Sequence, residues 1–228
     1  VDAIYALLLT GKDRLNQSEK VTVELGKQTL PVSTTANPLG YLKYTYTASE
    51  IQPDMLNADI TKTTDSPSWG GLYLQYFEKF DQVQQQKGIL SVTKKLFIEK
   101  IGSDGKQELL PLGKEKLKTG DKVITRLTLS LKQDMDFLYL KDFRAACFEP
   151  IGQLSGNQWK FGTVYYEESK DAVTNFFFNS LAKGTYVLEY PVWVNQAGTY
   201  QDGIATFQSM YAPEYTAYSE AGKITVTK

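Results

Sequence analysis

The acidic stretch YYEESKD is the part of the sequence whose residue types most readily suggest catalysis. It contains Glu167, Glu168 and Asp171, and a pair of carboxylates is the machinery that cleaves glycosidic bonds. Adjacent residues of a strand, however, point to opposite faces of a sheet, and acidic side chains are usually solvated. We therefore expect these carboxylates to form a solvated rim rather than a catalytic pair.

Histidine is absent from all 228 residues of the chain. Because histidine is the usual general base near neutral pH and the commonest metal ligand, its absence excludes His-dependent catalytic triads and His-bearing zinc sites. The segments SDGKQ and TDSPS carry oxygen ligands, but neither has the spacing of a calcium loop. The sequence therefore predicts no enzyme, no catalytic residue, no metal site and no cofactor.

The chain has a single cysteine, Cys147, which lies between apolar residues in the stretch FRAACFEP. A lone cysteine cannot form an internal disulfide, and a nucleophilic thiol needs a neighbouring base or positive charge to activate it. We expect Cys147 to be a buried structural thiol.

The composition is that of an ordinary globular protein, with 42% hydrophobic and 22% charged residues. Its 25 basic and 26 acidic residues are well mixed and give a formal net charge of -1. Such a balance attracts neither nucleic acid nor an anionic membrane. No run of about 18 apolar residues is present, so we expect no direct membrane insertion by this chain.

The pattern of apolar residues changes from helical to strand periodicity early in the chain. Val1, Ile4, Tyr5 and Leu8 have helical spacing that stops at Gly11, which predicts one short N-terminal helix. From Val21 the period becomes two, and turn-rich segments separate four candidate strands. These candidates are residues 21–25, 41–47, 57–63 and 69–80. The polar, Gln-rich stretch from Phe80 to Gly88 predicts a domain boundary near residue 88.

The second half of the chain alternates more regularly. In DKVITRLTLSL, the side chains of Leu127, Leu129 and Leu131 share one face with Thr125, as expected for a half-buried antiparallel strand. A similar alternation continues through GTYVLEYPVWVN, and several strands are separated by glycine-bearing turns. The sequence therefore predicts an all-β protein whose second half is an immunoglobulin-like antiparallel sandwich.

Aromatic side chains offer a second kind of candidate site. The segment SWGGLYLQYFEKF, together with Trp159 and Trp193, could form a platform for a sugar or a partner protein. As a strand, the segment would carry Leu72, Leu74 and Tyr76 on one face and Tyr73, Gln75 and Phe77 on the other, which favours a strand in contact on both faces. We expect core packing for these aromatic residues, in preference to ligand binding.

The stretch QSMYAPEYTA places Met210 and Tyr211 side by side just before Pro213. Neighbours on a strand point to opposite faces, so at most one of the two belongs to the core. The other is either an ordinary exposed apolar residue or part of a docking knob, since Met adapts to irregular pockets and Tyr supplies area with a polar tip. The residues alone favour neither alternative.

Several long motifs resemble the end of bacterial alpha-2-macroglobulins. The stretch FFFNSLAKGTYVLEYPVWVNQAGTYQDGIATFQSMYAPEYTAYSEAGKITV is similar to their final domain, and SWGGLYLQYFEKFDQV is similar to the segment after their thioester domain. VDAIYALLLTG resembles that domain's last helix, and MDFLYLKDFRAACFEPIGQLSG is similar to the version found in Bacteroides-type members. Together these motifs cover essentially the whole chain.

The resemblance implies that the chain is the C-terminal part of a much larger protein. Residues 1–15 would be the last helix of a truncated thioester domain, residues 16–87 a partial CUB-like β-domain, and residues 88–228 the terminal macroglobulin-like sandwich. Family members entrap proteases: cleavage of a bait region triggers a rearrangement, and an exposed Cys-Gln thioester acylates the protease.

The resemblance also implies a function for Met210 and Tyr211. In the bacterial family, a Met-Tyr pair of the last domain packs over the thioester and shields it from water until activation. The expected partners are the thioester domain of the same parent chain and, through the full-length protein, target proteases. The implied location is the bacterial cell envelope, either periplasmic or lipid-anchored.

The sequence also allows an alternative function, that of a binding module. A surface immunoglobulin-like module could use its Trp and Tyr side chains to bind glycan or a partner protein. A saturable effect of glycan on tryptophan fluorescence would favour this module over an inhibitor fragment.

Overall fold

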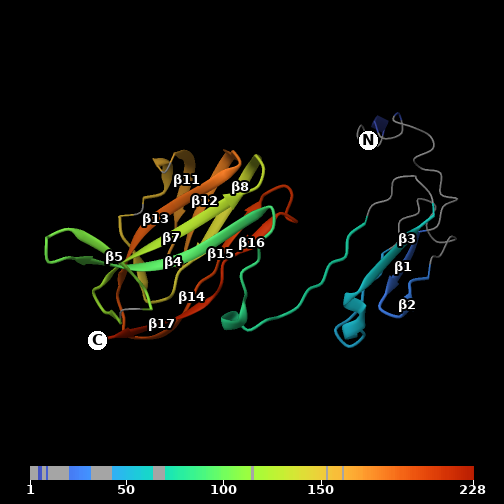
Figure 1. Cartoon of the computed structure of the whole chain (residues 1–228), viewed down its shortest axis with the longest axis horizontal. Helices are drawn as coiled ribbons and strands as arrows, with labels where there is room; N and C mark the ends of the chain where they lie inside the picture. Colours follow the sequence, from blue (N-terminus) through green and yellow to red (C-terminus); the bar gives the residue numbers. More distant parts are fainter. Residues whose placement is uncertain are drawn as a thin grey trace. The chain divides into compact units, whose positions relative to one another are not determined.

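The chain forms two compact units in which nearly all regular structure is β-strand, which confirms the predicted all-β class. A computed structural model describes residues 5–6, 9, 21–31, 43–63, 70–113, 116–152, 154–160 and 162–228. The first unit comprises Val1–Gln75 and the second comprises Tyr76–Lys228 (Figure 1).

At the N-terminus, Tyr5, Ala6 and Leu9 have helical backbone, and the other residues of the predicted helix lie outside the described residues. None of the helices described in this chain has the length and hydropathy needed to cross a membrane.

The first unit contains a three-stranded antiparallel sheet in the order β2-β1-β3. Its strands are β1 (Val21–Leu25), β2 (Gln28–Thr29) and β3 (Ala58–Lys62), and these confirm the predicted strands at residues 21–25 and 57–63. A tight turn at Gly26, whose φ is +60°, joins β1 to β2. A Cβ atom on Gly26 would lie 2.8 Å from Asp54 in the 3-10 helix η2 (Pro53–Leu56), so this close approach requires glycine.

Two predicted strands of the first half are wrong. Residues 43–47 form no strand, and residues 41–42 of that candidate lie outside the described residues. Residues 70–79 also lack regular structure, and the side chains of Tyr73 and Phe77 have exposed fractions of 94% and 101%. The expected core packing of this segment is therefore wrong within the described chain, whereas Trp69 lies outside it. A strand needs a neighbouring strand for its backbone hydrogen bonds, and sequence alternation alone cannot supply that neighbour.

The second unit is a sandwich of a six-stranded and a five-stranded sheet. The six-stranded sheet has the order β10-β11-β12-β8-β15-β16, with β10 (Gly156–Lys160), β11 (Thr163–Ser169), β12 (Val173–Leu181), β8 (Met135–Phe143), β15 (Ala205–Ser209) and β16 (Thr216–Tyr218). The five-stranded sheet has the order β5-β4-β7-β13-β9, with β5 (Gln107–Pro111), β4 (Leu90–Ile101), β7 (Lys122–Leu131), β13 (Gly184–Val194) and β9 (Phe148–Pro150).

A smaller three-stranded sheet completes the second unit. It contains β14 (Gly198–Asp202), β17 (Gly222–Thr227) and β6 (Leu117–Lys118) in the order β14-β17-β6. The chain leaves this sheet at the end of β14 and enters the six-stranded sheet at β15. Gly203 lies at the crossing, where an added Cβ atom would come within 2.2 Å of the Phe143 carbonyl oxygen.

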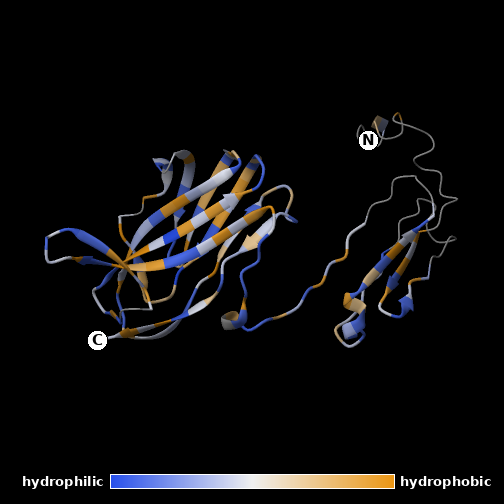
Figure 2. Ribbon diagram, in the orientation of Figure 1, coloured by the Kyte–Doolittle hydropathy of each residue, from blue (hydrophilic) through white to orange (hydrophobic). Residues whose placement is uncertain are grey.

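The core lies between the two large sheets and follows the predicted alternation. In β7, Leu127, Leu129 and Leu131 are buried on the same face as Thr125. The six-stranded sheet contributes large buried side chains from β8, β12 and β15, namely Leu138, Leu140, Phe176, Phe178 and Phe207. Figure 2 shows hydrophobic and hydrophilic residues alternating along these strands. This arrangement confirms the predicted immunoglobulin-like sandwich.

Residues 80–88 belong to the second unit and contact its strands. The segment begins with the 3-10 helix η3 (Phe80–Gln82), and Gln86 forms a β-bridge with Tyr218. The side-chain amide of Gln85 donates to the carbonyl oxygen of Val92 at 2.7 Å. The boundary near residue 88 stays a prediction.

Candidate functional site

Met210 and Tyr211 lie at the tip of the hairpin that joins β15 to β16. Hydrogen bonds fix the loop from within: the Ser209 amide donates to the Tyr215 carbonyl at 3.1 Å, and the Tyr215 amide donates to the Ala212 carbonyl at 3.0 Å. Pro213 restricts the backbone of the turn, and its carbonyl accepts the Thr216 hydroxyl at 2.5 Å. The tip is therefore held by the hairpin itself.

Neither residue of the Met-Tyr pair belongs to the core. The side chains of Met210 and Tyr211 have exposed fractions of 50% and 79%, whereas Phe207 and Ser209 are buried. Strand alternation explains the difference for Met210, since it follows the inward-facing Ser209. The Met210 amide donates to the Phe137 carbonyl of β8 at 2.9 Å, so the hairpin stays attached to the sheet beyond the end of β15.

Phe137 is a third member of this site that the sequence did not indicate. Its ring centroid lies 5.3 Å from that of Tyr211 at an interplanar angle of 83°, which is an edge-to-face contact. Phe137 has a φ of +52° and is the only non-glycine residue with positive φ among those described. This left-handed conformation of a bulky residue costs about 1–3 kcal/mol. We call Phe137, Met210 and Tyr211 the apolar tip.

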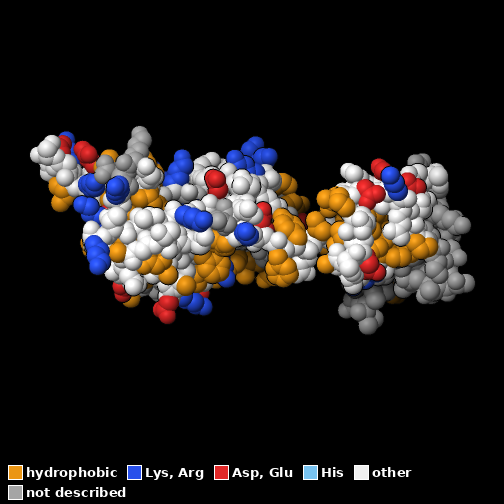
Figure 3. Space-filling view, turned by 90° about the horizontal axis from the view of Figure 1, so that it is seen from below, with side chains coloured by type: hydrophobic (Ala, Val, Ile, Leu, Met, Phe, Trp, Pro, Cys, Tyr) orange, Lys and Arg blue, Asp and Glu red, His pale blue; other side chains and the backbone are white. Residues whose placement is uncertain are grey.

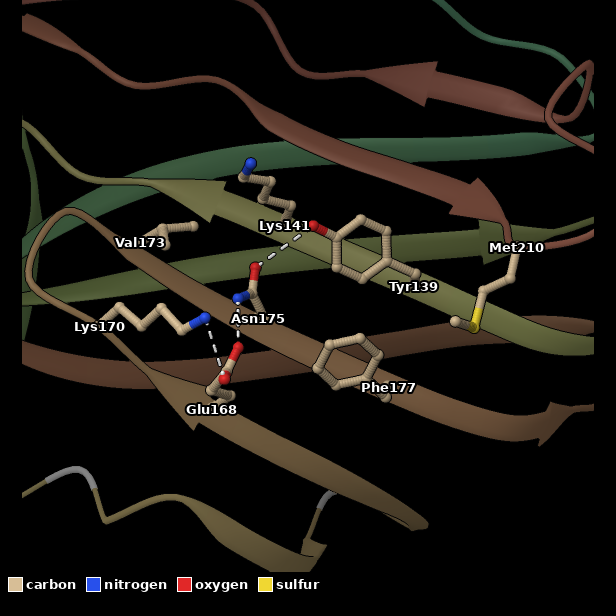
Figure 4. Close-up of a pocket in the computed structure, with 8 residues that line it drawn as sticks. All are labelled: Tyr139, Lys141, Glu168, Lys170, Val173, Asn175, Phe177 and Met210. Carbon is tan, nitrogen blue, oxygen red and sulfur yellow. Dashed lines mark hydrogen bonds and ion pairs between the residues drawn. The ribbon is translucent and has the colours of Figure 1, made fainter.

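A shallow depression of about 430 Å³ lies beside the apolar tip on the outer face of the six-stranded sheet (Figure 4). Tyr139 and Phe177 line it as a stacked pair whose centroids are 5.3 Å apart, and Tyr166 continues the aromatic row at 6.3 Å from Phe177. Met210 closes one end of the depression. The apolar tip is therefore continuous with a band of aromatic side chains.

Polar side chains at the other end of the depression bind one another. Glu168 accepts a hydrogen bond from Asn175 at 2.8 Å and forms an ion pair with Lys170 at 3.1 Å, as Figure 4 shows. The hydrogen bond from Asn175 and the contact with Lys170 lower the pKa of the Glu168 carboxyl. This carboxylate is thus stabilised in its ionised form on an open surface.

The two glutamates of the acidic stretch YYEESKD do not lie on the same face of the sheet. Glu168 lies on the outer face of β11, whereas Glu167 is buried on the inner face, where burial raises its pKa. The expectation that adjacent glutamates face opposite ways is confirmed, although Glu167 is not part of a solvated rim. No group of three or more metal-ligating side chains occurs among the described residues.

A buried ionic cluster links three strands within the sandwich. The Lys94 ammonium lies 2.9 Å from an Asp142 carboxylate oxygen and 3.0 Å from one of Asp202, and it also donates to the carbonyl oxygens of Phe143 and Gly203. Burial alone would lower the pKa of Lys94, but the two carboxylates outweigh it and raise the pKa. This cluster fixes the chain where it crosses from β14 to β15.

The predicted buried thiol is confirmed. Cys147 is fully buried in the sandwich core. Burial raises the pKa of its thiol to about 11, so the thiol stays protonated and unreactive near neutral pH.

The expected core packing of Trp159 and Trp193 is wrong, because both side chains are exposed. Trp159 lies in β10, the edge strand of the six-stranded sheet. Figure 3 shows charged side chains of both signs interspersed with apolar ones on the face in view, as the mixed composition predicts.

Comparisons with known proteins point to one family. A family model described as the bacterial alpha-2-macroglobulin MG10 domain matches residues 90–214, which is more than half of the chain. The match begins at β4 and ends within the β15–β16 hairpin, so it includes all three residues of the apolar tip. No match was found among curated protein sequences.

Among solved structures, bacterial alpha-2-macroglobulins match this chain. Escherichia coli alpha-2-macroglobulin activated by porcine elastase matches 64% of this chain with 18% identity and a TM-score of 0.50. Salmonella alpha-2-macroglobulin reacted with methylamine matches 92% with 17% identity and a TM-score of 0.49. The E. coli protein from domain MG7 to the C-terminus matches 63% with 18% identity and a TM-score of 0.47. The aligned regions span 14%, 13% and 24% of these longer chains.

Proposed function

Because the chain belongs to the bacterial alpha-2-macroglobulin family, a family of protease inhibitors, we propose that it is part of a longer inhibitor. In that protein, Met210 and Tyr211 pack over a thioester and shield it from water until a protease triggers activation. The partners proposed for this chain are therefore the thioester domain of the same polypeptide and, through the full-length protein, target proteases.

The observation that carries this proposal is a fixed hairpin that presents apolar side chains to solvent. Met210 and Tyr211 are exposed, yet the backbone on both sides of them is hydrogen-bonded within the hairpin and to β8. A preformed apolar knob can exclude water from a reactive acyl group. Its small area also allows release when the domains separate.

The proposed thioester belongs to residues outside this sequence. A Cys-Gln thioester requires a cysteine followed closely by glutamine, and the only cysteine here, Cys147, is buried in the sandwich. The 228 residues would therefore contribute the shield and not the reactive group.

We also propose the domain assignment that the resemblance implies. Residues 1–15 end a thioester domain, residues 16–87 are part of a CUB-like β-domain, and residues 88–228 are the macroglobulin-like domain. The exposed apolar side chains of residues 70–79 support the second assignment, since packing against the rest of such a domain would bury them. We place the longer protein at the bacterial cell envelope, in the periplasm or attached through a lipid anchor.

A second candidate function is supported by the aromatic band beside Met210. Tyr139, Phe177 and Tyr166 form a row of rings across the outer face of the sheet, and rings of this kind can stack on sugars. A glycan-binding module would show a saturable change of tryptophan fluorescence in the 228-residue chain, because Trp159 is exposed on the same sheet.

The rate of thioester loss in the full-length protein tests the proposed shield. Methylamine incorporation, followed by mass spectrometry, should be about tenfold faster or more when Met210→Ala and Tyr211→Ala are combined. Trp159→Ala combined with Val164→Ala removes an exposed aromatic and an exposed aliphatic side chain elsewhere on the sheet. This control should leave the rate unchanged.

Equal rates in wild type and in the Met210→Ala, Tyr211→Ala variant would contradict the shield. Absence of methylamine incorporation in wild type would mean that the longer protein has no working thioester and inhibits by another route.

A further inference from the structure

The geometry points to Phe137 as a positioning residue that holds Met210 and Tyr211 in the orientation needed for docking. This inference rests on the proposed shield and adds a residue from a different strand to it. Phe137 lies in β8, more than seventy positions before Met210 in the chain. The evidence consists of its backbone conformation, its ring contact and its exposure.

The backbone of Phe137 interrupts the regular pairing of β8. Its neighbours pair normally, with Asp136 opposite Ser180 and Leu138 opposite Phe178 of β12. Phe137 itself has a φ of +52°, and its carbonyl oxygen accepts the Met210 amide at 2.9 Å. The left-handed residue thus occurs at the position whose carbonyl holds the base of the apolar tip.

The ring of Phe137 contributes little to the stability of the fold. Its exposed fraction is 48%, so core burial does not compensate for the unfavourable backbone conformation. Glycine adopts positive φ freely, whereas a bulky residue there is an outlier. The contact that glycine would lose is the edge-to-face packing of the ring against Tyr211 at 5.3 Å.

This ring contact restricts the Tyr211 side chain before any docking takes place. An aromatic side chain that is already oriented loses less conformational freedom when a partner covers it. Phe137 therefore makes the apolar tip a preformed surface, whereas without the ring Tyr211 would have to be ordered by the partner.

Phe143 provides a matched control on the same strand. It is also an exposed phenylalanine of β8, and strand alternation places it on the same face as Phe137. Its ring contacts the Lys141 ammonium at 4.4 Å from the centroid. Removing this ring changes the exposed aromatic area of β8 at a position remote from the hairpin tip.

The first test measures the Tyr211 ring resonances by NMR in the 228-residue chain. In Phe137→Gly, the backbone can keep its conformation, so the resonances should move toward those of a free tyrosine while the Met210 amide stays protected from exchange. Phe143→Ala should leave the Tyr211 resonances unchanged. Unchanged Tyr211 resonances in Phe137→Gly would overturn the inference.

The second test measures thioester loss in the full-length protein. Phe137→Gly should accelerate the loss roughly two- to tenfold, the range expected for one aromatic pair. Adding Phe137→Gly to Tyr211→Ala should produce no further acceleration, because the two residues act through one contact. Phe143→Ala should have the wild-type rate.

The outcomes separate this inference from the proposed function. If the Met210→Ala, Tyr211→Ala variant loses its thioester faster but Phe137→Gly does not, the shield stands and the positioning by Phe137 is refuted. If neither variant differs from wild type, the shield itself fails, and positioning for docking fails with it.

Discussion

The two ends of strand β8 have opposite character. Near its C-terminal end, Asp142 is fully buried and lies in an ionic cluster with Lys94 and Asp202, while Tyr190 donates a hydrogen bond to the same Asp142 carboxylate. At the other end, Phe137 has a left-handed backbone, and its ring packs edge-to-face against the exposed ring of Tyr211. One strand thus joins a polar cluster in the interior to an apolar cluster at the surface.

This contrast separates what the fold requires from what a partner requires. The ionic cluster is complete within the chain, because the lysine is matched by two carboxylates and two carbonyl oxygens. The apolar tip is incomplete, because its strained backbone and exposed rings gain little from this fold alone. Changes at the ionic cluster should therefore alter stability, and changes at the apolar tip should alter docking.

The largest expected effect on stability comes from Lys94→Met. Removing the ammonium leaves Asp142 and Asp202 buried without a counter-charge, which should destabilise the chain by about 3–5 kcal/mol. The free energy of unfolding measured in urea would show this change. Lys95→Met is the control, since Lys95 is the exposed neighbour on β4, and it should change stability by at most about 0.5 kcal/mol. Similar values for the two variants would refute the structural importance of the cluster.

A smaller, pH-dependent effect is expected at Asp202. Burial raises the pKa of its carboxyl above the usual value, even though Lys94 opposes this shift. The folded state therefore binds this proton more tightly than the unfolded state, and the resulting stability is lost as the pH rises through the folded pKa. The unfolding free energy of Asp202→Asn should increase relative to wild type as the pH rises from about 3.5.

Urea unfolding of both chains at several acidic pH values measures this difference. A difference that stays constant with pH, or one that changes in favour of wild type, would contradict the raised pKa.

The smallest effect on stability is expected at the apolar tip. Phe137→Gly relieves the left-handed strain but increases the freedom of the unfolded chain, so stability should change by no more than about 1 kcal/mol in either direction. The Met210→Ala, Tyr211→Ala variant should remain within about 0.5 kcal/mol of wild type. Thermal unfolding of the 228-residue chain measures both. A loss of several kcal/mol in either variant would place these residues in the folding core and remove the contrast between the ends of β8.

The regular sandwich strands could be predicted from the sequence because local alternation is enough to identify them. Leu127, Leu129 and Leu131 alternate with polar residues, and every second residue from Leu188 to Val194 of β13 is likewise buried. Strand periodicity was misleading for residues 70–79, where apolar side chains would line both faces of a strand but no strand forms. Periodicity reports which face a residue would occupy in a sheet, and it does not report whether a neighbouring strand is available.

The site was only partly predictable. Met210 and Tyr211 stand out in the sequence because two large apolar neighbours cannot both enter one core, but only the family resemblance implies a shield; the structure leaves both exposed. Phe137 lies in a stretch that reads as a plain strand, so its positive φ has no sequence signal. The Lys94 cluster depends on residues from β4, β8 and β14, and only the tertiary fold brings these together.

Oxidative footprinting of Met210 and Tyr211 would test most directly whether the apolar tip is a covered shield. The oxidation rates of the two side chains should be compared between the 228-residue chain, the native full-length protein and the full-length protein after methylamine treatment. Our account predicts rapid oxidation in the 228-residue chain, strong protection in the native protein and renewed oxidation after methylamine. Equal rates in the 228-residue chain and the native protein would show that nothing covers the tip and would contradict the shield.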